Sequence, residues 1–119
     1  MGSHSVTRHK VVLVPFPFDD LSSSKVRPAV CLTDPMGPHK HVILAFVTSR
    51  IPDKLLETDL VIDARHTDFR ATGLQVSSTL QLHRLMTVTT SLLQRELGVL
   101  SPAVQAQVSA RLRKVFGLA

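Results

Sequence analysis

The sequence predicts a mainly β domain with one helix at its C-terminal end. Several short apolar runs, rich in β-branched residues, alternate with turns that contain proline, aspartate or glycine. The final segment instead repeats apolar residues at helical spacing. Short strands followed by a single helix indicate a small, strongly bent sheet or barrel, an architecture that serves many functions.

Composition places this domain among small, basic proteins. The chain has 119 residues, 44% of them hydrophobic, which suits one domain with a packed core. We expect residues 1–9 to be a tail that starts with a vector-derived Met-Gly-Ser-His, and residues 10–119 to be the single domain. The net charge of +5 makes nucleic acid a leading partner.

The sequence predicts a cytoplasmic protein without a membrane anchor. No apolar run approaches the roughly 20 residues that cross a bilayer, and no secretory signal pattern is present. The single cysteine, Cys31, falls in an apolar strand, where we expect it to be a small buried hydrophobe. A chain without cysteine pairs fits a reducing compartment.

The strand predictions rest on apolar runs between turn residues. The continuous run His41–Thr48 indicates a central strand that is buried on both faces. The register of the longest strand stays open, and a bulge in it is possible. The other expected strands are Val11–Val14, Ala29–Leu32, Asp59–Ile62 and Val76–Val88.

Two connections and the last helix complete the expected elements. An exposed loop over 63–72 should end at Gly73, and one helical turn over 91–96 should stop at Gly98. Ser101 suits a helix N-cap, and Gly117 ends the helix. We expect this helix to pack across the sheet through one apolar stripe, formed by Val104, Val108, Leu112, Val115 and Phe116.

Arg27 stands where a polar loop leads into the second strand. Pro28 restricts Arg27 to extended backbone angles. A guanidinium held on rigid backbone at the mouth of a loop is well placed to bind a phosphate. A surface ion pair with Asp19 or Asp20 is the simpler alternative for this arginine.

The common hydrolase motifs are missing. The histidines are scattered, without a cysteine pair or a His-Glu-x-x-His sequence, so we expect no metal site. The sequence also lacks a Gly-x-Ser-x-Gly turn and a glycine-rich phosphate loop. What remains is a set of basic and hydroxyl residues near strand ends, each of which could simply be solvated: Thr48, Ser49, Arg50, Ser77, Ser78, His83 and Arg84.

The order of several motifs resembles the MazF/PemK toxin family. The opening Val11–Phe18, followed by Lys25–Val30, is similar to the start of that family. The resemblance continues in register to about Leu118 and includes the terminal helix. The further matching segments are Ile43–Ser49, Thr72–Leu74, Ser77–Leu80 and Leu97–Ser101.

This resemblance implies both a fold and an activity. The fold would be an SH3-like β-barrel of the MazF/PemK/CcdB type, which forms a homodimer. The activity would be a metal-independent, sequence-selective endoribonuclease on single-stranded RNA such as mRNA, inhibited by a cognate antitoxin and needing no cofactor. The 2′-hydroxyl of the RNA would attack the adjacent phosphorus, leaving 2′,3′-cyclic phosphate and 5′-hydroxyl ends. Arg27 and Thr48 match the family's catalytic arginine and threonine.

Other residues are expected to contact the RNA, and some departures leave the proton transfers open. The sequence carries His9-Lys10 where many relatives have Gly-Asp, and Ser22–Ser24 where many have a glutamate. A base would then have to be Asp19 or Asp20, with His83 as a further candidate for proton exchange. The expected substrate contacts are Phe18, Lys25, Ser49, Arg50, Ser78, His83 and Arg84.

Two other functions fit the same fold. One is a non-enzymatic toxin that poisons DNA gyrase, which would not need Arg27 and Thr48 for chemistry. The other is a plain nucleic-acid-binding barrel, in which the basic charge serves affinity alone.

Overall fold

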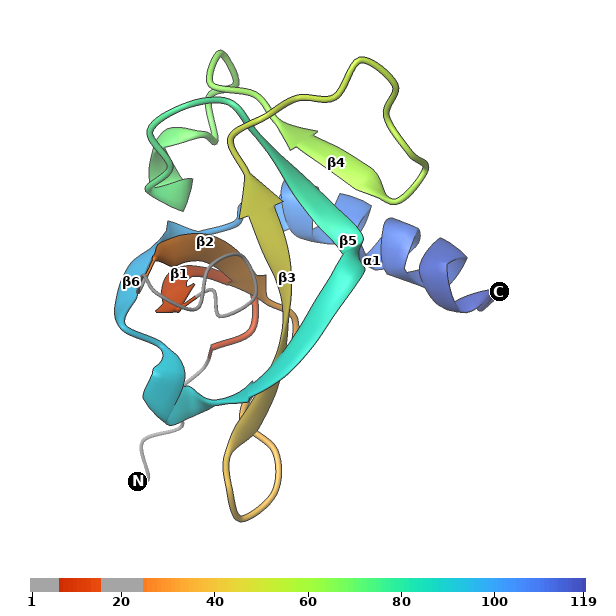
Figure 1. The fold of residues 1–119 in the computed structure, drawn as a ribbon. Coiled ribbons are helices and arrows are strands. Elements are labelled where there is room, and N and C mark those ends of the chain that lie inside the picture. The colour runs from red at the N-terminus through yellow and green to blue at the C-terminus, as the bar shows by residue number, and fades with distance from the viewer. Residues whose placement is uncertain (1–6, 16–24) are drawn as a thin grey trace.

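A computed structural model describes residues 7–15 and 25–119 of the chain. Strands and helices follow one another in the order β1 (Lys10–Pro15), β2 (Val26–Cys31), β3 (His41–Thr48), β4 (Asp59–Ile62), η1 (Arg70–Thr72), β5 (Ser78–Thr89), η2 (Thr90–Leu92), β6 (Arg95–Val99) and α1 (Pro102–Phe116). Figure 1 shows this arrangement.

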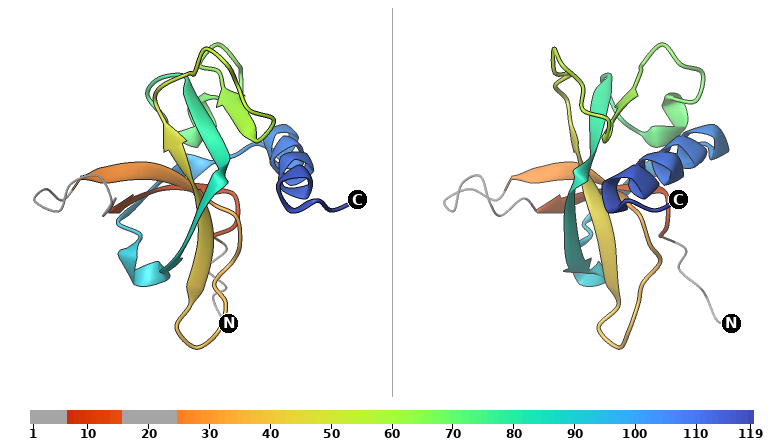
Figure 2. Two further views of the ribbon diagram at one scale, coloured as in Figure 1. Left: turned by 45° about the vertical axis from the view of Figure 1, so that its right-hand side comes forward. Right: turned by 90° about the vertical axis from the view of Figure 1, so that its right-hand side faces the viewer.

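The described strands form one antiparallel sheet in the order β4-β5-β3-β2-β1-β6. The sheet curls into a half-barrel, in which β3 and β5 form a long ribbon and β1, β2 and β6 cross beside it (Figure 1). The mainly β class with a C-terminal helix is therefore confirmed. The two views of Figure 2 show α1 on one side of the sheet, next to β4 and β5.

Apolar side chains pack on both faces of the sheet. Leu44 and Phe46 of β3 belong to one core cluster, whereas Ala45 and Val47 belong to the other. This division follows from the alternation of side chains along a strand. The prediction that His41–Thr48 is a central strand buried on both faces is confirmed, since residues 42 and 44–47 are buried.

The terminal helix matches its sequence signals at both ends. The Ser101 side chain accepts a hydrogen bond from the Val104 N–H at 3.3 Å, and Gly117 closes the helix at φ +64°. Val108 is buried at the centre of the apolar stripe. The stripe ends earlier than predicted, because Phe116 is 59% exposed.

The segment before this helix differs from the prediction. Only Thr90–Leu92 forms a helical turn, and Arg95–Val99 forms the edge strand β6, which pairs with β1. Gly98 therefore does not stop a helix but lies inside a strand, next to an irregularity in the β1–β6 register. The bulge allowed in the longest strand is present, because the partner of β3 changes from Leu85 to Gln81 in one step.

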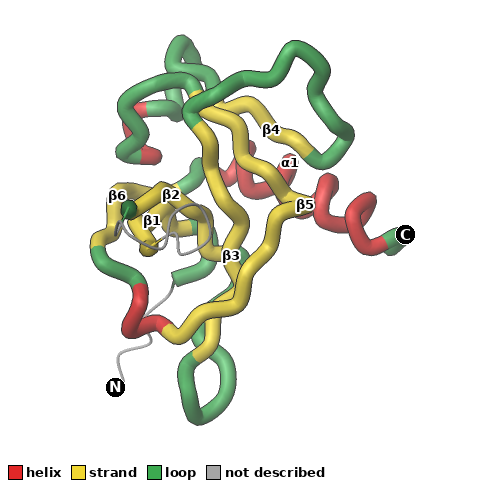
Figure 3. Tube along the Cα trace, in the orientation of Figure 1, coloured by secondary structure: helices red, strands yellow, loops and turns green. Residues whose placement is uncertain are grey.

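Two glycines allow η1 and β6 to pack backbone against backbone. A Cβ atom on Gly98 would lie 2.1 Å from the carbonyl oxygen of Ala71, and one on Gly73 would lie 2.1 Å from the carbonyl oxygen of Leu97. Gly73 also adopts φ +74°, which favours glycine. Figure 3 shows the short helix η1 beside the β6 end of the sheet. Both glycines belong to segments that resemble the toxin family, and their spatial contact explains why those positions are glycine.

The segment over 63–72 is not a simple exposed loop. It contains η1, and Thr72 is buried. The Thr72 hydroxyl donates to the Phe69 carbonyl at 2.6 Å and accepts from the Leu74 N–H at 3.1 Å.

Among the described residues, no helix is long and apolar enough to span a membrane.

We predict that Gly98→Ala is markedly destabilising. The new methyl group meets backbone atoms that cannot move aside as a flexible side chain could, so the free energy of unfolding should fall by about 3 kcal/mol. Gly37→Ala is the matched control, since it meets no atom within 4 Å and is strained only by its φ of +74°, which costs about 1 kcal/mol. Chemical denaturation of both variants measures the difference, and equal stability would contradict the packing argument.

Candidate functional site

A cavity of about 370 Å³ opens where β2 separates from β3. The two strands pair from Cys31↔Leu44 to Ala29↔Phe46, and no described pair continues toward Val26 and Thr48. Figure 1 shows β2 turning away from β3 beyond this point. The cavity is lined by Leu13, Val26, Arg27, Pro28, Val47, Ser49, Gly73, Leu74, Gln75, Val76, Ser78, Arg95 and Leu97.

Arg27 lies in this lining, on the part of β2 that pairs with β1 alone. Its register partner is Val14, and the next residue, Pro28, lies opposite Leu13. The extended conformation predicted for a residue before proline is confirmed by its place within β2. Pro28 lies outside the stretch that pairs with β3, which is where a residue without an N–H is tolerated in a strand.

Thr48 is the last residue of β3 and lies next to the cavity but outside its lining, between the lining residues Val47 and Ser49. Its Oγ1 accepts a hydrogen bond from the Arg50 N–H at 3.2 Å, which leaves its hydroxyl proton for another acceptor. Arg27 and Thr48 lie just beyond the last β2–β3 pair, Ala29↔Phe46, each on its own strand, so they flank the point where the two strands separate.

Two serines also line the cavity: Ser49, which follows the end of β3, and Ser78, the first residue of β5. Ser49 is exposed, and Ser78 is buried. The Ser78 hydroxyl donates to the Val76 carbonyl at 2.8 Å, so it can offer only an acceptor to a ligand. Thr79, also buried, donates to the Arg50 carbonyl at 2.9 Å. The turn after β3 is thereby fixed by two hydrogen bonds to the Arg50 backbone.

The other predicted contacts lie outside the cavity lining. Lys25, Arg50, His83 and Arg84 are all exposed. His83 Nδ1 lies 3.1 Å from Thr58 Oγ1 and 3.9 Å from Asp59 Oδ1, toward β4. Phe18, Asp19 and Asp20 fall outside the described residues. The structure thus gathers Arg27, Ser49 and Ser78 in one cavity, and the exposed cations Lys25, Arg50 and Arg84 lie outside its lining.

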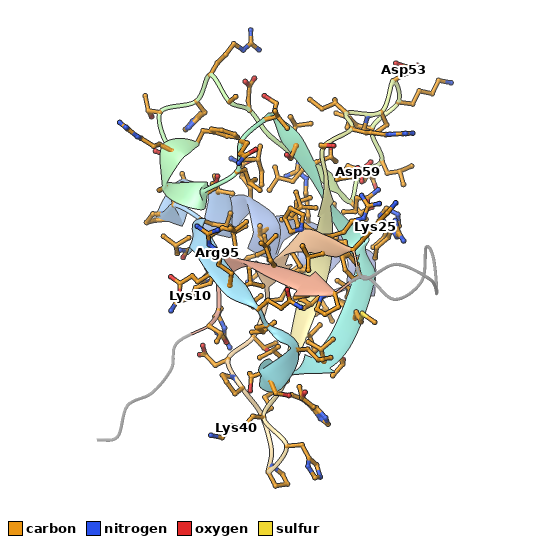
Figure 4. All side chains as sticks on the ribbon, turned by 60° about the vertical axis from the view of Figure 1, so that its left-hand side comes forward. Lys10, Lys25, Lys40, Asp53, Asp59 and Arg95 are labelled. Carbon is orange, nitrogen blue, oxygen red and sulfur yellow. The ribbon has the colours of Figure 1, made fainter. Side chains whose placement is uncertain are left out.

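Sequence reasoning missed Arg95, the second arginine of the lining. It was assigned to a helical turn, whereas it begins strand β6 opposite Leu13. The alternation of Arg95, Leu97 and Val99 is a period-two signal that could have indicated the strand. In Figure 4, Arg95 lies toward β6, on the opposite side of the view from Lys25.

Cysteine chemistry does not contribute to this site. Cys31 is fully buried, and burial raises the pKa of its thiol to about 11. The thiol therefore stays protonated at neutral pH and is a poor nucleophile. Within residues 7–15 and 25–119, no group of three His, Cys, Asp or Glu side chains is arranged to hold a metal ion.

Solved structures with a similar fold include MazF toxins and a mycobacterial endoribonuclease. Mycobacterium tuberculosis toxin MazF-mt6 superposes with a TM-score of 0.70 at 21% identity, over 92% of this chain and 98% of that one. An endoribonuclease from a mycobacterial species, in complex with its cognate antitoxin, gives 0.69 at 15% identity, over 94% and 95%. MazF from Deinococcus radiodurans gives 0.65 at 19% identity, over 98% and 100%.

At these identities, the similarity to solved structures establishes the fold. No curated protein matches the chain by sequence. The family model does match, and it spans residues 7–116, which is nearly the whole chain. The chain therefore belongs to the family of PemK-like, MazF-like toxins of type II toxin–antitoxin systems.

Proposed function

We propose that this protein is a metal-independent, sequence-selective endoribonuclease that cleaves single-stranded RNA. Membership of the toxin family supports the proposal, and the single structural observation that carries it is the cavity at the β2–β3 divergence. Its described lining contains two arginines, the Ser49 hydroxyl as a further donor, and no acidic residue. Such a cavity favours an anionic ligand such as a phosphodiester.

In the proposed reaction the RNA supplies its own nucleophile. The 2′-oxygen forms a bond to the adjacent phosphorus while the bond from phosphorus to the 5′-oxygen breaks. The 2′-hydroxyl proton leaves, and a proton reaches the 5′-oxygen, which gives a 2′,3′-cyclic phosphate and a 5′-hydroxyl. Because no protein nucleophile or metal-bound water is required, the missing hydrolase motifs are accounted for.

Arg27 and Thr48 would stabilise the charge that develops on the non-bridging oxygens. The planar guanidinium of Arg27 can donate two parallel hydrogen bonds to them. Thr48 can donate a further hydrogen bond. Its hydroxyl oxygen accepts from the Arg50 N–H, so its hydroxyl proton stays available for a phosphate oxygen. Donors that are fixed before the reaction starts are often the largest catalytic contribution.

The remaining predicted residues would bind parts of the RNA other than the reacting phosphate. Ser49 and Ser78 line the cavity: Ser49 can donate to a phosphate oxygen, whereas Ser78, which donates to the Val76 carbonyl, can only accept from a donor group of the RNA. Lys25, Arg50 and Arg84 are exposed cations that suit the RNA backbone. Phe18 as a stacking residue and His83 in proton exchange stay predictions.

We further propose that the protein forms a homodimer in the cytoplasm and is inhibited by a cognate antitoxin. The structurally similar mycobacterial endoribonuclease was solved with its own antitoxin. The antitoxin of this chain should place acidic or apolar side chains against the same basic cavity, because these complement two arginines and an apolar floor.

Removing the guanidinium should abolish most of the activity and leave the fold intact. We predict that Arg27→Ala lowers the cleavage rate by about two to three orders of magnitude, the cost of losing one charge-stabilising donor. Single-turnover cleavage of a labelled RNA measures the rate, and thermal unfolding checks the fold. Arg113→Ala, on the exposed face of α1, is the matched control and should cleave normally. Full activity of Arg27→Ala would remove Arg27 from the mechanism.

Cleavage should survive complete removal of divalent ions. The proposed mechanism assigns charge stabilisation to Arg27 and Thr48, so excess EDTA is expected to leave the rate unchanged. A metal-dependent ribonuclease assayed in the same buffer shows that chelation is complete. Loss of activity that is restored by adding a divalent ion would contradict the mechanism.

A single 2′-deoxy substitution should separate cutting from binding. When the nucleotide on the 5′ side of the cleaved phosphate lacks its 2′-hydroxyl, cleavage should stop while affinity stays nearly unchanged. Sequencing the ends of RNA cut by the wild-type protein first locates that nucleotide and identifies the termini. Continued cleavage of the substituted strand would exclude attack by the 2′-oxygen.

A further inference from the structure

We infer that Arg95 forms a second phosphate-binding position in the same cavity and holds a backbone phosphate of the RNA other than the one that reacts. This inference rests on the proposed function and goes beyond it, because the resemblance assigns no role to this residue. It follows from the position, the surroundings and the charge of Arg95.

The position of Arg95 follows from the strand register. Leu13 of β1 pairs with Pro28 on one side and with Arg95 on the other, so the three residues form one row across the sheet. Alternation directs their side chains to the same face, and all three line the cavity. Arg27 also lines the cavity, but as the register partner of Val14 it belongs to the alternate face of the sheet. Two strand spacings separate the Cα atoms of Pro28 and Arg95 by about 10 Å. A ligand between them is within reach of the Arg95 side chain.

The surroundings of Arg95 leave its charge without compensation. Its neighbour Glu96 forms an ion pair with Lys10 at 2.9 Å. Glu96 is also the register partner of Val12, so alternation directs it to the opposite face. Within residues 7–15 and 25–119, no hydrogen bond or ion pair holds the Arg95 side chain, and the described cavity lining includes no carboxylate.

The backbone that carries Arg95 is nevertheless fixed. Arg95 belongs to β6, which pairs with β1 and packs through Gly98 against η1. The N–H of the preceding residue, Gln94, donates to the Leu13 carbonyl at 2.9 Å. The backbone that carries this charged side chain is already ordered. Binding a phosphate in the cavity therefore costs little backbone entropy. The reacting phosphate is assigned to Arg27, so Arg95 is left for another phosphate of the strand.

The test measures the binding of an uncleavable strand as a function of salt. The probe is the RNA with the single 2′-deoxy substitution described above, titrated against the full chain between roughly 50 and 200 mM salt. We expect Arg95→Ala to bind it about tenfold more weakly at the lower salt concentration. The slope of log K against log salt should become shallower by about 0.7, the value for one phosphate contact with a single strand.

Two further variants separate charge from structure. Arg95→Lys keeps a positive charge and should retain the wild-type slope, while Arg113→Ala removes an exposed arginine outside the cavity and should leave both slope and affinity unchanged. In cleavage assays Arg95→Ala should raise KM about tenfold and change kcat little, because the reacting phosphate keeps its contact with Arg27. Thermal unfolding of Arg95→Ala should match wild type, since the side chain is exposed.

The outcomes distinguish this inference from the proposed function. If the wild-type protein cuts RNA and Arg27→Ala does not, but Arg95→Ala binds with wild-type slope and affinity, the second phosphate position is overturned and the ribonuclease proposal stands. If the wild-type protein neither binds nor cuts RNA, both proposals fall together.

Discussion

The contact between η1 and β6 is the constraint on which the shape of the cavity depends. Ala71 and Leu97 place carbonyl oxygens where the side chains of Gly98 and Gly73 would otherwise be. Main chain packed this closely can occur only where both segments lack a Cβ atom. Leu97 lies between the cavity and this contact, and Gly73 itself lines the cavity. The two glycine segments, separated in sequence by the whole of β5, thus form one wall.

Most of the fold could be predicted, because its strongest signals are local. The run of β3, the cap at Ser101 and the helix stop at Gly117 each depend on a few neighbouring residues. Strand β6 carries only a short local signal, the alternation of Arg95, Leu97 and Val99, because its conformation depends mainly on pairing with β1, which is distant in sequence. The burial of Thr72 is a similar case, because η1 becomes enclosed only when β6 packs against it.

In the candidate site too, the residue with a local sequence signal was predicted, and the residue placed by distant pairing was missed. Arg27 was predicted from the proline that follows it, and the structure places it in the cavity. Arg95 was missed because its segment was assigned to a helix, and no local pattern joins it to Arg27. Both arginines line one cavity because β2 and β6 flank the same strand, β1, in which Val14 pairs with Arg27 and Leu13 pairs with Arg95. The curl of the sheet also determines which exposed cations lie near that cavity, so local sequence does not reveal them.

The position of the cavity follows from the way the sheet curls. Strands β2 and β3 pair through their apolar halves and separate at Ala29 and Phe46, just before each reaches its polar end. Arg27 and Thr48 lie just beyond this point on their two strands, and the gap between the strands leaves room for a ligand. A closed ladder there would fill the space with backbone hydrogen bonds. The same divergence that ends the sheet therefore creates a site that offers positive charge and hydroxyl groups, which suits a substrate that carries its own nucleophile.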